Sequence, residues 1–241
     1  MSIQHLPKVL ATAAMGGLLA VAASSAFAQQ TADLSITGTI IPTPCTVNVD
    51  GNSAANFGAI QPASSQAGDD YRVVGDTGSA MSMVVQCPAN RKVSFTVLDG
   101  LAGSAVTDAG LRDLLKTISP TAPDANQVFG LGTVTVNGKT INLGAYSLET
   151  LAAGSAQIGT ATSAAIRSQD GTSGWERTNF YGADGATYAT NRAPDMANGP
   201  VAAQTVRFPM RLRAAVNKPS ELQQADEIKL QGEAVFTVKY E

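Results

Sequence analysis

Histidine is almost absent from this chain of 241 residues, since His5 is its only one, and Trp175 is its only tryptophan. Charged residues make up 15% of the sequence and aromatic residues 5%. His5 lies in a leader-like segment, so Ser–His and Cys–His nucleophilic pairs are excluded from the remainder. No G-x-S-x-G elbow, P-loop or G-x-G-x-x-G fingerprint is present. We expect no enzyme, and no catalytic, cofactor-binding or metal site.

Residues 1–28 have the features of a secretory signal peptide. Lys8 supplies a positive charge, an apolar run of Ala, Leu, Val, Gly and Met follows, and Ala26-Phe27-Ala28 is typical of a cleavage site. No later run approaches the roughly 20 apolar residues of a membrane span. We therefore expect an exported chain that begins at Gln29 and carries no membrane anchor.

Removal of residues 1–28 on export would change the net charge of the chain, and an oxidising compartment would favour a disulfide between its cysteines. Residues 1–28 contain Lys8 and no acidic residue, so 15 basic and 19 acidic residues remain. This balance argues against nucleic acid as a partner. The two cysteines, Cys45 and Cys87, both fall in the exported part, and a lone pair in an oxidising compartment predicts one disulfide. A metal site is disfavoured because two thiolates do not complete a zinc shell.

Alternation of apolar residues predicts strands along most of the remaining chain. At the C-terminal end Ala234, Phe236, Val238 and Tyr240 fall on one face of a strand. Near the other end, within the leading segment (residues 29–41), Leu34, Ile36, Gly38 and Ile40 alternate with polar residues. A glycine inside a strand indicates that a partner needs the room, so this segment is a candidate to enter a groove.

The middle of the chain contains further strands and two irregular tracts. Strands are expected over 81–87, ending at Pro88, over 93–97, and in a hairpin turning at Asn137-Gly138. Residues 101–126 are expected to form an inserted loop, with a short helix within 108–118. Residues 151–204 are rich in small residues and are expected to form a second decorated loop. Its aromatic groups, Trp175 and Tyr181 among them, either anchor this loop or form an exposed recognition surface.

Two further groups of charged residues have simple explanations. Arg207, Arg211 and Arg213 alternate with apolar residues, which indicates the solvent-facing side of one strand. Several aspartates stand in turn-like contexts, where Asp is favoured by hydrogen bonds to the backbone. A hydrolase built on two carboxylates stays open as a minor alternative, because sequence does not reveal which carboxylates meet in space.

The order of these features resembles that of fimbrial (pilus) subunits of the chaperone–usher pathway, of the type 1-like pilin family. The matching features are a signal peptide, an alternating segment with a glycine before the first cysteine, a second cysteine 42 positions later, and a final strand with a penultimate tyrosine. The resemblance covers both ends of the exported chain and both cysteines. It fades in 101–126 and 151–204.

This resemblance implies an all-β fold, an incomplete immunoglobulin-like β-sandwich formed by residues 42–241. It implies that Cys45 and Cys87 join the first strand to the second, and that Phe236, Val238 and Tyr240 line the edge of an open groove. A periplasmic chaperone would fill this groove first. The leading segment of a neighbouring subunit would then replace it, inserting its Leu34, Ile36, Gly38 and Ile40 at an outer-membrane usher.

The expected function is therefore a structural subunit of a cell-surface fimbria that contributes to adhesion. The alternative from another class is a secreted or tip adhesin that binds carbohydrate, with Trp175 and Tyr181 as stacking groups. A tip adhesin would need a separate lectin domain, for which the chain has no room.

Overall fold

The fold is an all-β sandwich, as expected from the alternating sequence. The computed structural model describes residues 43–51, 69–78, 81–152, 154–192, 194–222 and 228–241. The leader, residues 1–28, and Leu34, Ile36, Gly38 and Ile40 of the leading segment lie outside the described residues. Pro42–Glu241 forms one compact unit.

The described strands are short, apart from β3 and β13. They are β1 (Thr46–Gly51), β2 (Arg72–Asp76), β3 (Met81–Asp99), β4 (Phe129–Gly130), β5 (Thr133–Val136), β6 (Lys139–Asn142), β7 (Gly144–Thr150), β8 (Ser155–Ile158), β9 (Ala161–Ser168), β10 (Glu176–Arg177), β11 (Phe180–Tyr181), β12 (Thr187–Asn191), β13 (Ala202–Val216) and β14 (Ala234–Tyr240). The helices are α1 (Ala109–Leu114), α2 (Pro219–Leu222) and a 3-10 turn, Asp195–Asn198.

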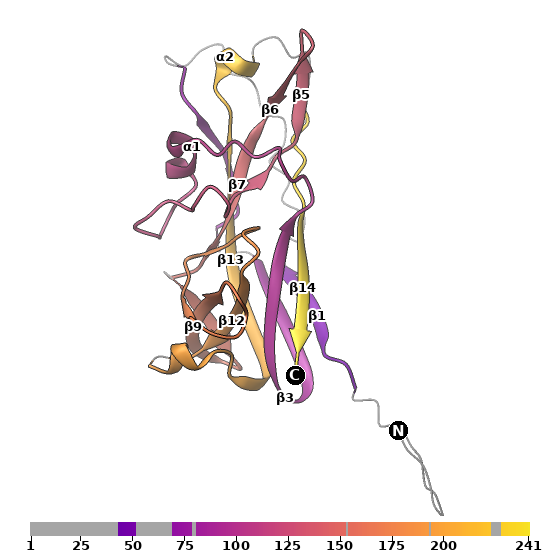
Figure 1. Ribbon diagram of the computed structural model, residues 1–241, viewed down its shortest axis with the longest axis vertical. Coiled ribbons are helices and arrows are strands. Elements are labelled where there is room, and N and C mark those ends of the chain that lie inside the picture. The colour runs from indigo at the N-terminus through magenta and orange to yellow at the C-terminus, as the bar shows by residue number, and fades with distance from the viewer. Residues whose placement is uncertain (1–42, 52–68, 79–80, 153, 193, 223–227) are drawn as a thin grey trace, which may run out of the picture. The chain divides into compact units, whose positions relative to one another are not determined.

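Strand β3 belongs to both sides of the sandwich. Its first half pairs with β1 and β13, and its second half pairs with β14 and β12 (Figure 1). The prediction that Pro88 ends a strand is wrong, because β3 continues through it. The register of the ladder between β3 and β13 shifts in the segment that contains Pro88: Thr205 of β13 is opposite Gln86, and Ala203 is opposite Arg91. Pro88 therefore lies where no amide is needed for pairing, which is where a strand tolerates proline.

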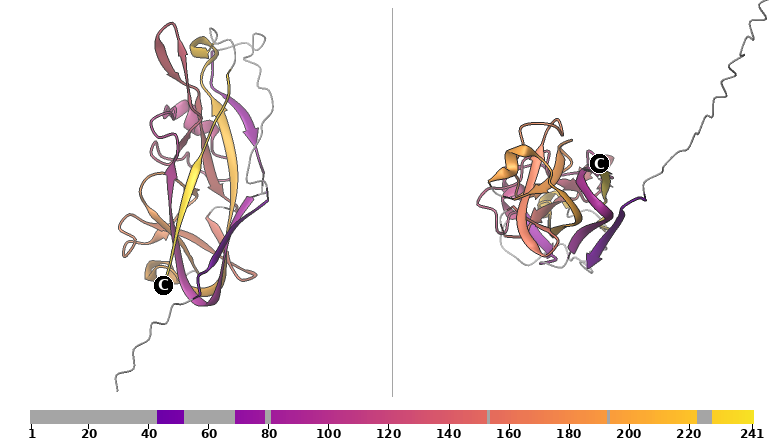
Figure 2. Two further views of the ribbon diagram at one scale, coloured as in Figure 1. Left: turned by 90° about the vertical axis from the view of Figure 1, so that its right-hand side faces the viewer. Right: turned by 90° about the horizontal axis from the view of Figure 1, so that it is seen from below.

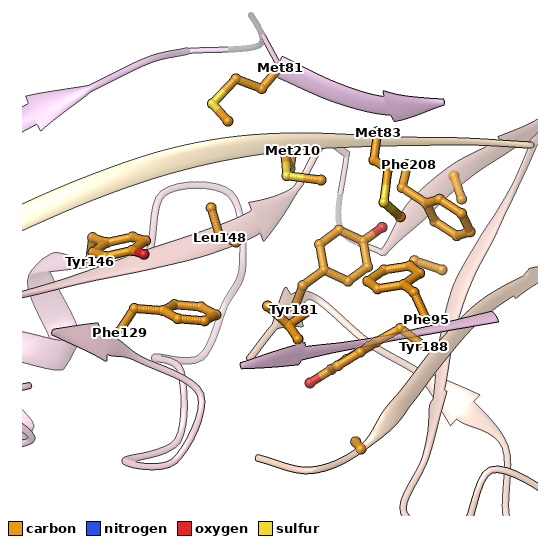
Figure 3. Close-up of a cluster of buried hydrophobic side chains, with 14 of the residues drawn as sticks. Met81, Met83, Phe95, Phe129, Tyr146, Leu148, Tyr181, Tyr188, Phe208 and Met210 are labelled. Carbon is orange, nitrogen blue, oxygen red and sulfur yellow. The ribbon is translucent and has the colours of Figure 1, made fainter. Parts of the chain in front are cut away.

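The core lies between the two layers and is centred on Phe95 of β3. Its ring lies 4.8 Å from that of Phe208, 5.4 Å from that of Tyr181 and 5.5 Å from that of Tyr188, measured between centroids. Figure 3 shows these rings together, with methionines from β3 and β13 beside them. Aromatic side chains from four strands thus join the layers in one contiguous core.

The predicted hairpin at Asn137-Gly138 is confirmed. Strands β5 and β6 flank this pair and form a separate two-stranded sheet. Asn137 has φ 52° and Gly138 has φ 78°, the positive values that a type I′ turn requires. The turn residues thus fix the local register, as sequence reasoning anticipated.

The tract 151–204, expected to be a decorated loop, instead contributes β8 to β12 to the main sheet. Trp175 is buried with Ile166, and Met196 packs against this cluster. Tyr181 has no exposed surface. Of the two alternatives for these aromatic groups, anchoring of the tract is confirmed and an exposed recognition surface is wrong, because both side chains are packed inside the domain.

The tract 101–126 is a loop that contains α1, as predicted. The Asp108 side chain accepts a hydrogen bond from the Gly110 amide and caps the helix. The buried Glu149 of β7 fixes the segment after α1, because its Oε1 accepts from the amides of Ile118 (2.8 Å) and Ser119 (2.5 Å). The loop therefore lies against the outer face of β7 and β13, where α1 covers a small apolar cluster.

Candidate strand-accepting edge

The C-terminal strand β14 lies at an edge of the main sheet and is only partly covered. Among the described residues it pairs with β3 alone, where Phe236 is opposite Val97 and Val238 is opposite Phe95. Directly opposite residues lie on the same face of a sheet. Val97 and Phe95 are completely buried, whereas Phe236 and Val238 are half-buried and Tyr240 is 39% exposed. The core-facing side of β14 therefore keeps apolar surface in contact with solvent.

Side-chain exposure likewise increases from β13 through β3 to the edge strand β1. Val47 is opposite Val85 of β3, and Val85 is opposite Val206 of β13. Val206 and Val85 are buried, but Val47 is 43% exposed. In the next row Val49, 39% exposed, is opposite the buried Met83. These valines are opposite core residues of β3, and no described strand pairs with β1 on its other side.

We refer to the core-facing residues of β1 and β14 as the strand-accepting edge: Val47, Val49, Phe236, Val238 and Tyr240. Figures 1 and 2 show β1 and β14 on the same side of the domain, joined through the two halves of β3. Sequence reasoning identified the β14 residues but missed those of β1. The alternation of Val47 and Val49 was visible, yet their exposure depends on what covers them in three dimensions.

The disulfide fixes the start of β1. Cys45 and Cys87 form a bond with an S–S distance of 2.06 Å, which confirms the predicted pairing. Cys87 lies in β3 and Cys45 directly precedes Thr46, the first residue of β1. The cross-link therefore ties an otherwise exposed edge strand to the centre of the sandwich.

The arginines of β13 are paired on its outer face. Arg207 contacts Asp50 of β1 at 3.1 Å, and Arg211 donates two hydrogen bonds of 2.6 Å to Asp76 of β2. The prediction of a simple solvent-facing row is thus corrected, since these side chains link β13 to β1 and β2. Desolvation would raise the pKa of Asp76, but hydrogen bonds from Arg211 and from the Gly78 amide, with the nearby guanidinium charges, hold its pKa below the usual range.

This lowered pKa predicts how Asp76→Asn changes the pH dependence of stability. A carboxyl group with a lower pKa in the folded state stabilises the protein above its unfolded pKa, and loses that contribution as the pH falls. Asp76→Asn should therefore lower the free energy of unfolding by about 1 kcal/mol at pH 7 and by less at pH 3. Urea denaturation at both pH values measures the effect.

Asp113→Asn is the matched control for this experiment. Asp113 pairs with Lys116 on an exposed surface, so its replacement should change the free energy of unfolding by less than about 0.5 kcal/mol. An Asp76→Asn effect that is equal at the two pH values would contradict the assigned role of the carboxylate.

One family model matches the chain. The model of DUF1120, described as a protein of unknown function, matches residues 34–147. This range begins at Leu34, the first of the alternating residues of the leading segment, and contains β1, β3 and both cysteines. No curated protein and no solved structure matches the chain.

The described residues also bear on a metal site and on a membrane-spanning helix. Within the described ranges, no group of three or more His, Cys, Asp or Glu side chains is placed to hold a metal ion. No helix in the part of the chain that the structure describes is long and apolar enough to cross a membrane. Of the turn aspartates, Asp184 accepts hydrogen bonds from the Ala186 amide (3.0 Å) and the Tyr188 hydroxyl (2.8 Å). Its carboxylate therefore stabilises the turn between β11 and β12.

Proposed function

We propose that this chain is a structural subunit of a cell-surface fimbria, and that subunits polymerise by exchanging strands. The chain would be exported, held by a periplasmic chaperone and passed to an outer-membrane usher, where neighbouring subunits join. It would contribute to adhesion as part of the filament. The proposal assigns it no catalytic activity.

The observation that supports this proposal best is that core-facing side chains are more exposed on the edge strands β1 and β14 than on the strands beside them. In each row of core-facing residues the inner positions are buried, whereas the outer position is exposed at Val47, Val49 and Tyr240 and half-buried at Phe236 and Val238. An additional strand would bury these side chains and pair with the outer backbone groups of β14, which among the described residues pairs with β3 alone. Strand addition of this kind gains main-chain hydrogen bonds and places every second side chain in a pocket.

The leading segment of a second copy is the occupant that we propose. Its alternating part, residues 34–40, has seven residues, and β14 has the same length. Leu34, Ile36 and Ile40 would face the core, where the edge presents only apolar side chains. Burial of three such residues would stabilise the assembly by several kcal/mol before the cost of association, at roughly 1.5–3 kcal/mol each.

A charge on the core-facing side of β14 is expected to prevent strand binding. A fluorescent peptide of residues 31–41 should bind the full chain, measured by fluorescence anisotropy. Val238→Asp should weaken binding by roughly 10- to 100-fold, because the carboxylate would be buried without a partner.

Thr237→Asp is the matched control, because Thr237 is the preceding residue of the same strand and lies on its exposed face. This variant should bind the peptide within about twofold of the unmodified chain. Failure of the unmodified chain to bind the peptide would overturn the proposal, because the groove would then be closed by the chain's own residues. Equal binding by both variants would also contradict it.

A further inference from the structure

The segment that follows α1 crosses the outer face of β7 and β13 and is held there by side chains of both strands. We refer to residues 115–119 as the strap. The Ser147 hydroxyl of β7 donates to the first carbonyl oxygen of the strap (2.8 Å), and Arg213 Nη1 of β13 donates to the Thr117 hydroxyl (3.2 Å). Glu149 Oε1 of β7 accepts from the last two amides of the strap. Three polar side chains thus bind the strap at successive positions along its length.

The strap is attached mainly by hydrogen bonds rather than by apolar packing. All of its residues are described, and Leu115 is the only apolar one that is buried, because Ile118 is 43% exposed. Ser119 is also buried, and its hydroxyl accepts a hydrogen bond from Asn179 Nδ2 (3.1 Å). Segments that are held by few apolar contacts open locally at low free-energy cost. Beyond Leu115, the position of the strap therefore depends on its hydrogen bonds.

Glu149 is a buried carboxylate that is only half satisfied. It is 1% exposed, and its Oε2 has no hydrogen-bond partner among the described residues. Arg211 of β13 is directly opposite, but its guanidinium donates to Asp76 instead. Arg213 occupies the diagonal position, and Phe180 of β11, which carries no charge, is opposite Glu149 on the other side. Oε2 is therefore a buried oxygen that no described guanidinium binds.

The charge of this carboxylate contributes directly to the attachment of the strap. Nearby on the strap and on α1, Lys116 and Asp113 pair with each other at the surface. Among the described residues, Glu149 is the one carboxylate that binds the strap backbone. A hydrogen bond to a charged acceptor is roughly twice as strong as one to a neutral acceptor. A proton on Oε2 would end the burial of an unpaired charge and would weaken both bonds from the strap.

We propose that Glu149 is an acid-sensitive latch, and that protonation of its carboxyl group releases the strap from the outer face of β7 and β13. At neutral pH the carboxylate holds two consecutive amides of the strap, and the positive charges of Arg211 and Arg213 attract it. In acid, Oε2 takes a proton from solvent and both amides are left bonded to a neutral acceptor, so the strap opens at lower cost. The inference is independent of strand exchange, because the latch lies on the outer face and the strand-accepting edge faces the core.

Hydrogen exchange of the two latched amides, followed by NMR on the full chain, tests the latch. After correction for the intrinsic exchange rate, protection of the Ile118 and Ser119 amides should fall at least about tenfold between about pH 7 and about pH 4. The protected amides of β3 within residues 93–97 should stay protected at both pH values. They report whether the domain as a whole remains folded.

Glu149→Gln provides a second measurement, because glutamine keeps an oxygen that can accept from both amides but carries no charge. At about pH 7 this variant should show the low protection that the unmodified chain shows at about pH 4, with less than about a twofold change between the two pH values. Asp113→Asn is the control, because Asp113 lies close to the strap but pairs with the Lys116 side chain at the surface. This control should keep the pH dependence of the unmodified chain.

Each outcome supports or overturns the latch. Equal protection of the Ile118 and Ser119 amides at the two pH values would overturn it, and so would an equal loss of protection in β3, which would indicate unfolding of the whole domain. A Glu149→Gln variant that keeps the full pH dependence would assign the effect to another group. A loss confined to the two strap amides, unchanged by Asp113→Asn, supports the latch even where Glu149→Gln fails to fold.

Discussion

Replacing both cysteines by serine is expected to lower the free energy of unfolding by about 4 kcal/mol. The disulfide closes a loop of 42 positions, and its loss returns that conformational freedom to the unfolded chain. The effect is large because domains of this size are stable by only about 5–15 kcal/mol. Denaturant unfolding of Cys45→Ser/Cys87→Ser and of the unmodified chain, followed by circular dichroism, measures the difference.

Reduction provides the control for the cysteine variant. Dithiothreitol should destabilise the unmodified chain by a similar amount and leave the double variant unchanged. We also expect β1 to lose protection from amide hydrogen exchange before β3 does, since β1 is exposed along its whole length. A double variant as stable as the oxidised chain would contradict the structural role of this bond.

Phe95→Ala is the second substitution for which we expect a large effect, about 3–5 kcal/mol. Its ring is completely buried and contacts aromatic rings of β11, β12, β13 and β14, so its removal leaves a cavity between the two layers. The same denaturant measurement applies. Leu98→Ala is the matched control, because Leu98 lies on the same strand but is 56% exposed.

The expected change for Leu98→Ala is below about 0.5 kcal/mol. Phe95→Ala should also weaken peptide binding at the strand-accepting edge, since Phe95 is opposite Val238 and lies beside it on the same face of the sheet. Equal destabilisation by the two substitutions would show that the face assignment of β3 is incorrect.

Local patterns in the sequence predicted the strands that have a single buried face. β14, the two halves of β3 and the hairpin at Asn137-Gly138 follow from alternation and from turn residues that need positive φ. The disulfide followed from the presence of two cysteines and from the oxidising compartment that the leader-like segment led us to expect. These features depend on near neighbours in the sequence, which is why they could be predicted.

The tract 151–204 could not be predicted in the same way. Its strands β8, β9 and β12 are built largely from Ala, Ser and Thr, so they lack strong apolar alternation. They become strands through pairing: β12 with β3, and β8 with β13. The burial of Trp175 and the exposure of Val47 likewise depend on which distant segment covers each side chain.

The pairing of β3 also has a consequence for how quickly the domain forms. Val85 pairs with Val206 and Val97 with Phe236, each more than 100 residues later in the chain. Contacts between such distant residues require large loops to close, and high contact order slows folding to milliseconds or seconds. During this time the unpaired strands are available to other chains and favour aggregation. Dilution or a holding factor during refolding should therefore raise the yield of native protein.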